Sequence, residues 1–448
     1  MTDQPTAADL SADIKRVFEA QQAHQWEVKA SDAATRKAKL QKLKDAVERH
    51  ADDIVAAVER DTRKPESEVR TTEVMGIMGN IQLNIDNLEE WMKPTEVTPT
   101  NNPDDKAMIV PEARGVCLIL GPWNFPMGLT FGPIAAAVAA GNTCMVKLTD
   151  LCPNVAKMAK TIVEEAFDEN EVAVFEGDVS VAEALLDLPF NHIFFTGSTR
   201  VGKIVMAAAA KHLSTVTLEL GGKSPVIIDQ GTPIAPVAAA LAGAKQFNGG
   251  QACICPDYVF VPQDKQDELV EGFRANVQKN LYESGELDKS SIAQIVNQSN
   301  FKRVKGLVDD AVDKGATIAV GGEMEEDDLT IHPTMLTDVT PQMKILQEEI
   351  FAPVLPVMTY DNLDQVIDYI AARDKPLALY MFSGNEENMD KVLRRTSSGG
   401  TTLNGVFSHY LENRLPFGGV NGSGMGSYHG KFGFEEFSHH RAVYRHMA

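Results

Sequence analysis

A glycine-flanked cysteine is the residue of this chain whose chemistry is most apparent from sequence. Cys253 lies in the run GGQACICP (residues 249–256), directly before the apolar segment 257–261. A cysteine at the tip of a turn, between small residues and a strand, can expose its sulfur to a cleft, where the thiolate is a strong nucleophile. The alternative is a buried thiol that packs as a small hydrophobic group. A catalytic Cys253 would need other residues that serve the same reaction.

Two polar side chains, one just after a strand candidate and one at the end of another, could serve the same reaction as Cys253. Asn124 lies in GPWNFP (residues 121–126), where two prolines fix a tight loop. Its amide could donate to an oxyanion, or only satisfy its own turn. Glu219 lies in LELGGKSP (residues 218–225). A carboxylate between apolar residues is partly desolvated, which raises its pKa and suits it to general base catalysis, unless it pairs with a lysine or a backbone amide.

A glycine-containing turn points to nucleotide binding. The run FTGSTRVGK (residues 195–203) follows a strand candidate and opens a helical stretch, where a helix N-terminus can hold a dinucleotide pyrophosphate. It departs from the pattern G-x-G-x-x-G because Thr199 replaces the middle glycine. It also fits the first part of the phosphate-binding loop of nucleotide hydrolases. That pattern next needs a serine or threonine to bind magnesium, and this chain has Ile204, which disfavours a hydrolase.

Further candidate site residues lie at the ends of other predicted strands or just before them. Lys147 and Asp150 lie in VKLTD (residues 146–150), where the ribose of a bound nucleotide would meet the sheet edge. The alternative for Lys147 is a solvated side chain at a strand end. Glu349 and Phe351, in EEIFAP (residues 348–353), add only that a carboxylate and a ring precede a strand.

The elements that must position these residues are short apolar runs alternating with helical stretches. Such alternation implies right-handed crossovers and parallel sheets covered on both faces. We expect an α/β protein with two doubly wound (Rossmann-like) domains plus a small β-rich bridging element. The first series of strand candidates covers residues 116–120, 143–148, 172–176, 192–196 and 215–220, and the second covers 225–229, 258–261, 352–358, 377–382 and 400–403.

The remaining segments have other patterns. The first 90 residues look helical, and apolar spacing predicts an amphipathic helix over residues 31–62. Residues 94–111 bring several prolines among threonines and asparagines, which is typical of a loop or an edge strand. The tail from Arg414 is rich in glycine and aromatic residues without a helical period, and predicts loops and short strands.

Composition excludes several classes of partner. The chain has 63 acidic and 42 basic residues and a net charge of -21, so it would repel nucleic acid and anionic membranes. Its five cysteines are widely spread and form no disulfide framework, which indicates a reducing compartment. The start lacks the features of a secretion signal, and Pro133 and Gly141 interrupt the most apolar stretch. We expect a soluble cytoplasmic protein with no nucleic-acid or membrane partner.

Taken together, the motifs resemble the aldehyde dehydrogenase superfamily over nearly the whole chain. The context of Cys253 and the tail LPFGGV to GMGSYHG (residues 415–430) look like the class 3 branch, which includes fatty, aromatic and coniferyl-type aldehyde dehydrogenases. The resemblance implies that Cys253 is the nucleophile and Glu219 the general base. It also implies that Asn124 is the side-chain half of an oxyanion hole whose other half is the backbone N–H of Cys253.

The implied reaction is oxidation of an aldehyde to a carboxylic acid. The Cys253 thiolate adds to the aldehyde carbonyl, the thiohemiacetal oxyanion is held by the two donors, and hydride passes to a nicotinamide. Water activated by Glu219 then hydrolyses the thioester. Cys255 has no catalytic role and, in an extended run, would point away from Cys253. A metal site is not expected, because these two cysteines supply two ligands where a closed zinc site needs four.

The resemblance also implies how NAD, or possibly NADP, is held. Gly197, Ser198 and Gly202 match the pyrophosphate turn, and Lys147 the lysine near the adenosine ribose. The family often has Pro-Ser-Glu after that lysine, whereas this chain has Leu-Thr-Asp, so the acid at Asp150 is shorter. A carboxylate there repels a 2′-phosphate, which favours NAD, although Arg200 could meet such a phosphate. The remaining implied cofactor contacts are Trp123, Leu220, Glu349 and Phe351.

The domain and partner predictions follow from the same resemblance. We expect a dinucleotide-binding domain (residues 1–90 and 111–220), a catalytic domain (221–413) and a bridging or oligomerisation element (91–110 and 414–448) that supports a homodimer. Phe125 and the aromatic tail predict an apolar channel for aromatic or medium-chain aldehydes. Two alternatives stay open: a CoA-acylating relative, which would not need Glu219, and a nucleotide-binding protein without redox activity.

Overall fold

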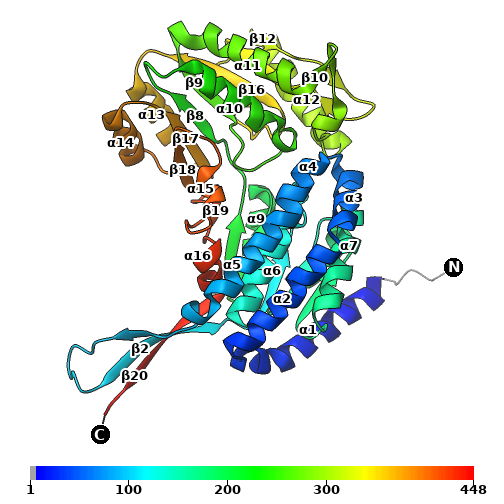
Figure 1. Cartoon of the computed structure of the whole chain (residues 1–448), viewed down its shortest axis with the longest axis vertical. Coiled ribbons are helices and arrows are strands. Elements are labelled where there is room, and N and C mark those ends of the chain that lie inside the picture. Colours follow the sequence, from blue (N-terminus) through cyan, green and yellow to red (C-terminus); the bar gives the residue numbers. More distant parts are fainter. Residues whose placement is uncertain (1–6, 448) are drawn as a thin grey trace, which may run out of the picture.

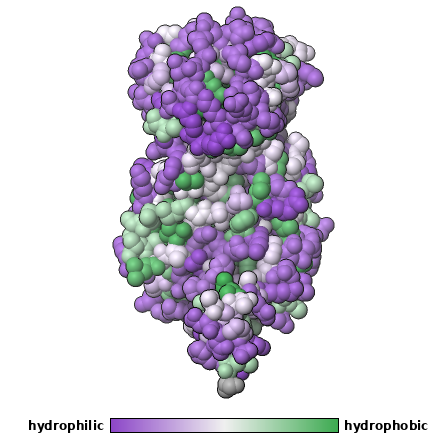
Figure 2. Space-filling view, turned by 90° about the vertical axis from the view of Figure 1, so that its left-hand side faces the viewer, coloured by the Kyte–Doolittle hydropathy of each residue, from purple (hydrophilic) through white to green (hydrophobic). Residues whose placement is uncertain are grey.

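The structure, a computed structural model that describes residues 7–447, consists of two parallel-sheet bodies and a projecting antiparallel arm (Figure 1). The N-terminal helices and the first sheet form the lower body in Figure 1, and the second sheet with its helices forms the upper one. Figure 2 shows a largely hydrophilic face that narrows between the two bodies. The expected α/β class with two doubly wound sheets is confirmed.

The first sheet has six strands in the order β19-β7-β6-β3-β4-β5. All neighbours are parallel except β19, which pairs antiparallel with β7. β3, β4, β5 and β6 are buried along their whole length, which is why they read as continuous apolar runs. Their bounds are β3 Val116–Leu120, β4 Thr143–Lys147, β5 Val172–Phe175, β6 His192–Thr196, β7 Thr215–Glu219 and β19 Gly424–Met425.

Helices cover both faces of this sheet. The helical segment predicted over residues 31–62 forms two helices that meet at His50. The His50 N–H donates to the carbonyl of Ala46 and the His50 carbonyl accepts from Ile54, so one residue ends the first helix and starts the next. The helices are α1 Ala7–Ala30, α2 Ala33–Arg49, α3 Ala51–Thr62, α4 Glu66–Val69, the π-helix η1 Arg70–Met75, α5 Gly76–Trp91, α6 Gly128–Ala140, α7 Pro153–Ala166, α8 Val179–Leu186 and α9 Thr199–Ala210.

The second sheet has seven strands in the order β12-β15-β16-β9-β8-β17-β18. Its neighbours are parallel except β12, which pairs antiparallel with β15. The strands are β8 Pro225–Ile228, β9 Tyr258–Pro262, β12 Thr317–Val320, β15 Thr334–Thr337, β16 Val354–Tyr360, β17 Ala378–Phe382 and β18 Gly400–Leu403, and the longer helices are α10 Ile234–Gln246, α11 Gln266–Leu281, α12 Gln298–Asp313, α13 Leu363–Ala371 and α14 Glu386–Arg395.

The arm joins two segments far apart in the chain. β1 (Thr95–Val97), β2 (Lys106–Ala113) and β20 (Ser438–Arg445) form a three-stranded antiparallel sheet in which β20 is an edge. β2 and β20 pair from Lys106 with Arg445 to Ala113 with Ser438. The prediction of a loop or an edge strand for residues 94–111 agrees with β1 and with the loop at 98–105, whereas β2 lies at the centre of this sheet.

The expected tail of loops and short strands agrees with the structure over residues 414–429 and is wrong beyond them. It also contains the helix α16 (Gly430–Glu436), and β20 is eight residues long. α16 is held by packing against α5 and α6, because Phe434 and Phe437 join the main buried cluster.

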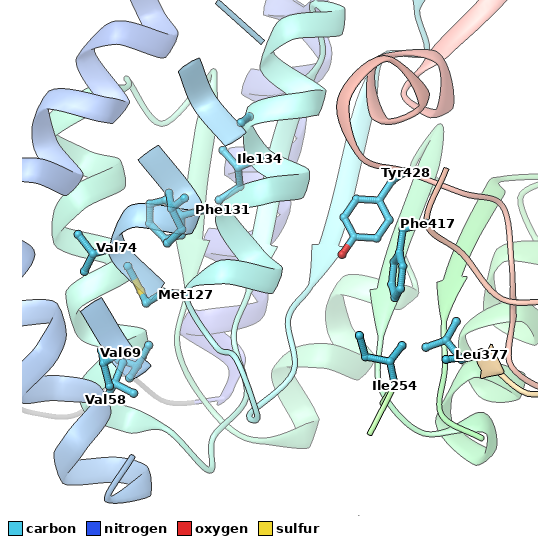
Figure 3. Packing of buried hydrophobic residues seen from close by; sticks show 14 of the residues in the cluster. Val58, Val69, Val74, Met127, Phe131, Ile134, Ile254, Leu377, Phe417 and Tyr428 are labelled. Atoms are coloured by element: carbon cyan, nitrogen blue, oxygen red, sulfur yellow. The ribbon is translucent and has the colours of Figure 1, made fainter. Parts of the chain in front are cut away.

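Buried side chains fix the position of the segments nearest the chemistry. Val69 and Val74, from α4 and η1, lie beside Met127 at the start of α6 (Figure 3). On the other side of the same view, Ile254 lies with Leu377, and Phe417 and Tyr428 lie above them (Figure 3). Within residues 7–447, no helix is both long and apolar enough to cross a membrane.

Candidate active site

Four predicted site residues come together at one edge of the first sheet. Asn124 follows β3, Lys147 ends β4, Gly197 follows β6 and Glu219 ends β7. Because β3, β4, β6 and β7 are parallel neighbours, their carboxyl ends all lie at the same edge. Parallel pairing therefore gathers residues that are up to 95 positions apart in the chain.

Cys253 reaches this edge on a turn with an unusual backbone. After α10, Asn248, Gly249 and Gly250 all have positive φ, at 48°, 57° and 73°. A Cβ on Gly250 would overlap the carbonyl of Ala352, so the glycine is required there. The run is a turn, in which the N–H of Cys255 donates to the carbonyl of Ala252 at 2.9 Å, and not the extended segment considered above.

The surroundings of Cys253 favour the neutral thiol in the absence of ligands. Burial raises the pKa of the thiol, and the carboxylates of Glu349 and Glu219 raise it further. The backbone N–H groups of Cys253 and Ile254 act in the opposite direction on that pKa, because they favour the thiolate. The thiol is only partly enclosed by protein atoms, unlike the other four cysteines, which are buried.

Cys255 is bound into the core. Its Sγ donates to the carbonyl of Ala244 at 3.4 Å, and burial raises the pKa of its thiol. The neighbouring carbonyl of Ile254 accepts from the Tyr380 hydroxyl at 2.6 Å, while the Ile254 side chain packs into the buried cluster. These contacts fix the C-terminal half of the turn and leave Cys253 as the thiol that faces the site.

Glu219 is a buried carboxylate without a hydrogen-bond partner. It is 3% exposed, and neither carboxylate oxygen accepts a hydrogen bond from the described residues. Burial raises its pKa well above the ordinary value, and the charge of Glu436 adds to this. The alternative of a carboxylate paired with a lysine or a backbone amide is thus excluded for residues 7–447. An unpaired, desolvated carboxylate at the sheet edge is what a general base requires.

Asn124 is held between two loops. Its side-chain amide donates to the carbonyl of Gln251 at 3.1 Å, two residues before Cys253. Its backbone carbonyl accepts from the Asn248 side chain and from Lys64 Nζ, each at 2.9 Å. A carboxamide nitrogen carries two N–H donors, so one remains for a ligand oxygen. The hydrogen bond to Gln251 ties Asn124 to the nucleophile loop, which goes beyond an asparagine that satisfies only its own turn.

Sequence reasoning missed three charged residues that contact the loops of Asn124 and Cys253. Lys64 and Glu73 are both 0% exposed and form an ion pair of 2.8 Å. Glu68 accepts a hydrogen bond from the backbone N–H of Asn248 at 2.9 Å, and burial raises its pKa to about 7. The sequence signal was small: a lysine before Pro65 and acidic residues in a short helical segment, all of which also fit a solvated face.

The glycine turn after β6 fits a dinucleotide phosphate. Ser198 is the N-cap of α9, and its hydroxyl accepts from the N–H of Val201. A Cβ on Gly202 would lie 2.7 Å from Leu220, and one on Gly197 would lie 2.5 Å from the ring of Phe195. Close packing against Leu220 and Phe195 thus requires glycine at both positions, and the N-terminus of α9 favours an anionic group. Ile204, at the magnesium position of the hydrolase pattern, is 53% exposed on α9.

Lys147 and Asp150 differ in their surroundings. Lys147 is 7% exposed, so the alternative of a solvated lysine is wrong. Burial lowers the pKa of its ammonium group, while the charges of Asp150 and Asp178 oppose that shift. Asp150 is exposed in the turn after β4, where its carboxylate can meet a ligand.

The predicted ribose contacts lie beside the loop after β7. Glu349 accepts from the N–H of Gly222 at 3.2 Å, and burial raises its pKa to about 8. Glu349 also lines a cavity of about 380 Å³ together with the Gly221–Gly222 loop. Phe351 has a positive φ of 52°, and its ring meets the Trp123 ring edge to face at 5.4 Å. Within residues 7–447, no cluster of three or more potential metal ligands is found.

Aromatic side chains line the approach from Asn124 to the tail. The ring of Phe125 stacks on Phe247 at 5.5 Å, and Phe247 meets Phe407 at 5.7 Å. Trp123, Phe407, Tyr410 and Cys253 all pack against the main buried cluster. Tyr410 and Tyr428 lie close enough to Cys253 for the thiol to affect the pKa of both phenols. The surroundings of the thiol therefore combine aromatic rings with the carboxyl groups of Glu219 and Glu349.

The comparisons with known proteins agree with this geometry. The model of the aldehyde dehydrogenase family matches residues 4–443. AldX of Bacillus subtilis is 51% identical over 433 residues, which cover 96% of this chain and 97% of AldX. Aldehyde dehydrogenase family 3 member A2 of Mus musculus is 43% identical over 406 residues, covering 90% and 82% of the two chains.

A solved structure gives the same result for the fold. The substrate-bound state of Staphylococcus aureus AldH superposes with a TM-score of 0.93 at 37% identity, covering 97% of this chain and 94% of that one. The match spans both sheets and the arm, so the resemblance inferred from the motifs is confirmed. The chain belongs to the aldehyde dehydrogenase family and is an oxidoreductase that acts on the aldehyde group.

Proposed function

We propose that the protein oxidises aromatic or medium-chain aldehydes to carboxylic acids with NAD, through a thioester on Cys253 that water resolves. The observation that carries this proposal is the joint presence of a partly open thiol, an unpaired buried carboxylate and a carboxamide tied to the thiol's loop. These three groups supply the nucleophile, the base and the oxyanion donor that acyl transfer needs.

The residues have separate tasks in this mechanism. Cys253 loses its thiol proton to solvent and its Sγ attacks the aldehyde carbon as the thiolate; the resulting oxyanion accepts hydrogen bonds from the backbone N–H of Cys253 and from Asn124 Nδ2. Bound nicotinamide supplies the hydride acceptor. Glu219 then removes a proton from the water that attacks the thioester, and burial, which raises its pKa, makes the carboxylate a stronger base.

The side chains present fit a dinucleotide. Gly197, Ser198 and Gly202 would hold the pyrophosphate at the N-terminus of α9, where the first backbone N–H groups of a helix favour an anion. Lys147 and Asp150 would contact the adenosine ribose, with Trp123 and Leu220 nearby. Glu349 and Phe351 would hold the ribose next to the nicotinamide.

The proposed reaction predicts a specific product pattern. With NAD and an aldehyde, we expect acid release without CoA. Across a panel of aldehydes, kcat/KM should be highest for aromatic and medium-chain members, because Phe125, Phe247 and Phe407 offer an apolar surface. Acid production that depends on CoA would instead favour the acylating alternative. Absence of any NAD reduction would favour the non-redox alternative.

Cofactor choice tests the role of Asp150. We expect kcat/KM to be higher with NAD than with NADP, because an exposed carboxylate at this position repels a 2′-phosphate. The expected preference is about tenfold or more, since a charge repulsion of about 1.4 kcal/mol gives that factor. Asp150→Asn should reduce the preference for NAD. Arg200→Gln is the control, because it removes the other charge that could meet a 2′-phosphate. A clear preference for NADP in the unaltered protein would refute the assignment.

The arm supports a homodimer. β20 is an eight-residue edge strand of the three-stranded sheet, and its outer side has free backbone groups within the described chain. Pairing with a second copy would satisfy them. A light-scattering mass equal to one chain of 48.8 kDa would contradict the dimer.

A further inference from the structure

We propose that the buried Lys64–Glu73 pair is the positioning device of the oxyanion hole. It acts through the backbone of the loop that carries Asn124, and this inference rests on the oxyanion role proposed for that residue. Lys64 and Glu73 contact no substrate in this mechanism; they determine where the Asn124 amide points.

The pair forms hydrogen bonds to both ends of the loop from Asn124 to Gly128. Lys64 Nζ donates to the backbone carbonyl of Asn124 at 2.9 Å. Glu73 Oε2 accepts from the N–H groups of Met127 and Gly128, at 3.0 and 2.7 Å, where α6 begins. The ion pair of 2.8 Å between Lys64 and Glu73 joins these two attachments. The five residues from Asn124 to Gly128 are therefore held at one carbonyl and two amides by a single buried pair.

The nucleophile loop is tied to the same carbonyl. Asn248 donates from its side chain to the carbonyls of Asn124 and Gln251, at 2.9 and 3.0 Å. Lys64 and Asn248 thus share one acceptor, the Asn124 carbonyl, which lies between the loop of the oxyanion donor and the loop of the nucleophile. A shift of this carbonyl would change the distance between Asn124 Nδ2 and Cys253.

The burial of the pair indicates that it positions the loop more than it stabilises the fold. Both side chains are 0% exposed, and two charges taken out of water gain little net stability over a well-packed apolar pair. The ammonium group also lies 4.0 Å from the centre of the Phe125 ring, next to Asn124 in the chain. A buried cation bonded to both Glu73 and the Asn124 carbonyl restrains the loop, and transition-state contacts require positions that are held to within fractions of an ångström.

A double-mutant cycle with Asn124 tests the proposal. We expect Lys64→Met to lower kcat/KM by about 10- to 100-fold, mostly in kcat, because misplacing a catalytic group by about 1 Å costs on that order. In the Asn124→Ala background, the same substitution should change kcat/KM by less than about twofold, since there is no amide left to position. Equal losses in the two backgrounds, or no loss in Lys64→Met, would overturn the proposal.

Controls separate positioning from folding. Arg36, a buried cation that donates to the carbonyl of Ala139 at the other end of α6, provides the matched variant Arg36→Met. It should lower Tm and leave kcat/KM unchanged. If Lys64→Met does not fold, the neutral pair Lys64→Met with Glu73→Gln removes the uncompensated charge and should show the same coupling to Asn124. Full activity of Asn124→Ala alone would instead refute the oxyanion role in the proposed function.

Discussion

Cys253→Ala is expected to abolish aldehyde oxidation, with a fall in kcat of at least about 10⁴-fold. The thioester cannot form without the sulfur, and the remaining oxyanion donors cannot replace a nucleophile. The measurement is the burst of NADH on mixing the enzyme with NAD and an aldehyde, which should disappear together with steady-state turnover. Cys253→Ser should behave in nearly the same way, because a serine hydroxyl with no adjacent base is a poor nucleophile.

Cys255→Ala is the matched control for this experiment. It removes a thiol two residues away that is hydrogen-bonded to Ala244 in the core. The variant should lose some stability through the missing contact and keep its burst. A Cys253→Ala protein with full activity would show that the assignment of the nucleophile is wrong. Loss of the burst in Cys255→Ala with a native Tm would show the same.

Glu219→Gln is expected to separate acylation from deacylation. The burst of NADH should remain, since the nucleophile and the oxyanion donors are intact, while steady-state acid release should fall by about 10²- to 10⁴-fold. Acyl-enzyme should then accumulate and be visible by mass spectrometry as an adduct on Cys253. Loss of the burst and of turnover to the same extent would place Glu219 in the first half of the reaction instead.

The raised pKa of Glu219 also fixes the sign of two pH effects. The base must be deprotonated, so kcat of the unaltered protein should rise with pH until the carboxyl has titrated, and that rise should be absent in Glu219→Gln. In the folded protein the carboxyl keeps its proton at pH values where the unfolded chain has lost it. Stability therefore decreases as pH rises from the unfolded pKa to the folded one.

Thermal unfolding checks the second of these effects. The Tm of Glu219→Gln relative to that of the unaltered protein should increase as pH rises above about 4.3, the ordinary pKa of glutamate, because glutamine does not have to lose a proton in the core. The variant Glu436→Gln removes the second cause of the shift and should increase Tm in the same direction by a smaller amount. A relative Tm that falls with pH would contradict a raised pKa.

Much of the fold was predictable because parallel strands have a simple signature. Residues 116–120 and 192–196 were predicted to the residue, because parallel neighbours on both sides bury β3 and β6 and make them short, apolar runs bounded by turns. β15, with the sequence TMLT, escaped prediction because two of its four buried residues are threonines. α16 escaped because two glycines give it a low helix propensity, and its stability comes from packing.

The candidate site was predictable only where chemistry lies in local motifs. Cys253, Glu219 and Asn124 each follow a strand or turn that can be recognised in a few letters, although their roles remain predictions. Lys64 and Glu73 could not be found in this way. Their role depends on the contact between Lys64 and the carbonyl of Asn124, 60 residues later in the chain. That contact forms only when the chain has folded and η1 packs against α6.

The antiparallel strand β19 determines when the first sheet is completed during synthesis of the chain. Gly424 pairs with Glu219, and the carbonyl of Ser423 accepts from the N–H of Leu220 at 3.1 Å. The strand that ends in the proposed general base thus lacks its outer neighbour until the chain has been extended 205 residues beyond Glu219. All strands of the second sheet come before β19 in the sequence. The first sheet therefore gains its last strand only after the second sheet has been synthesised in full.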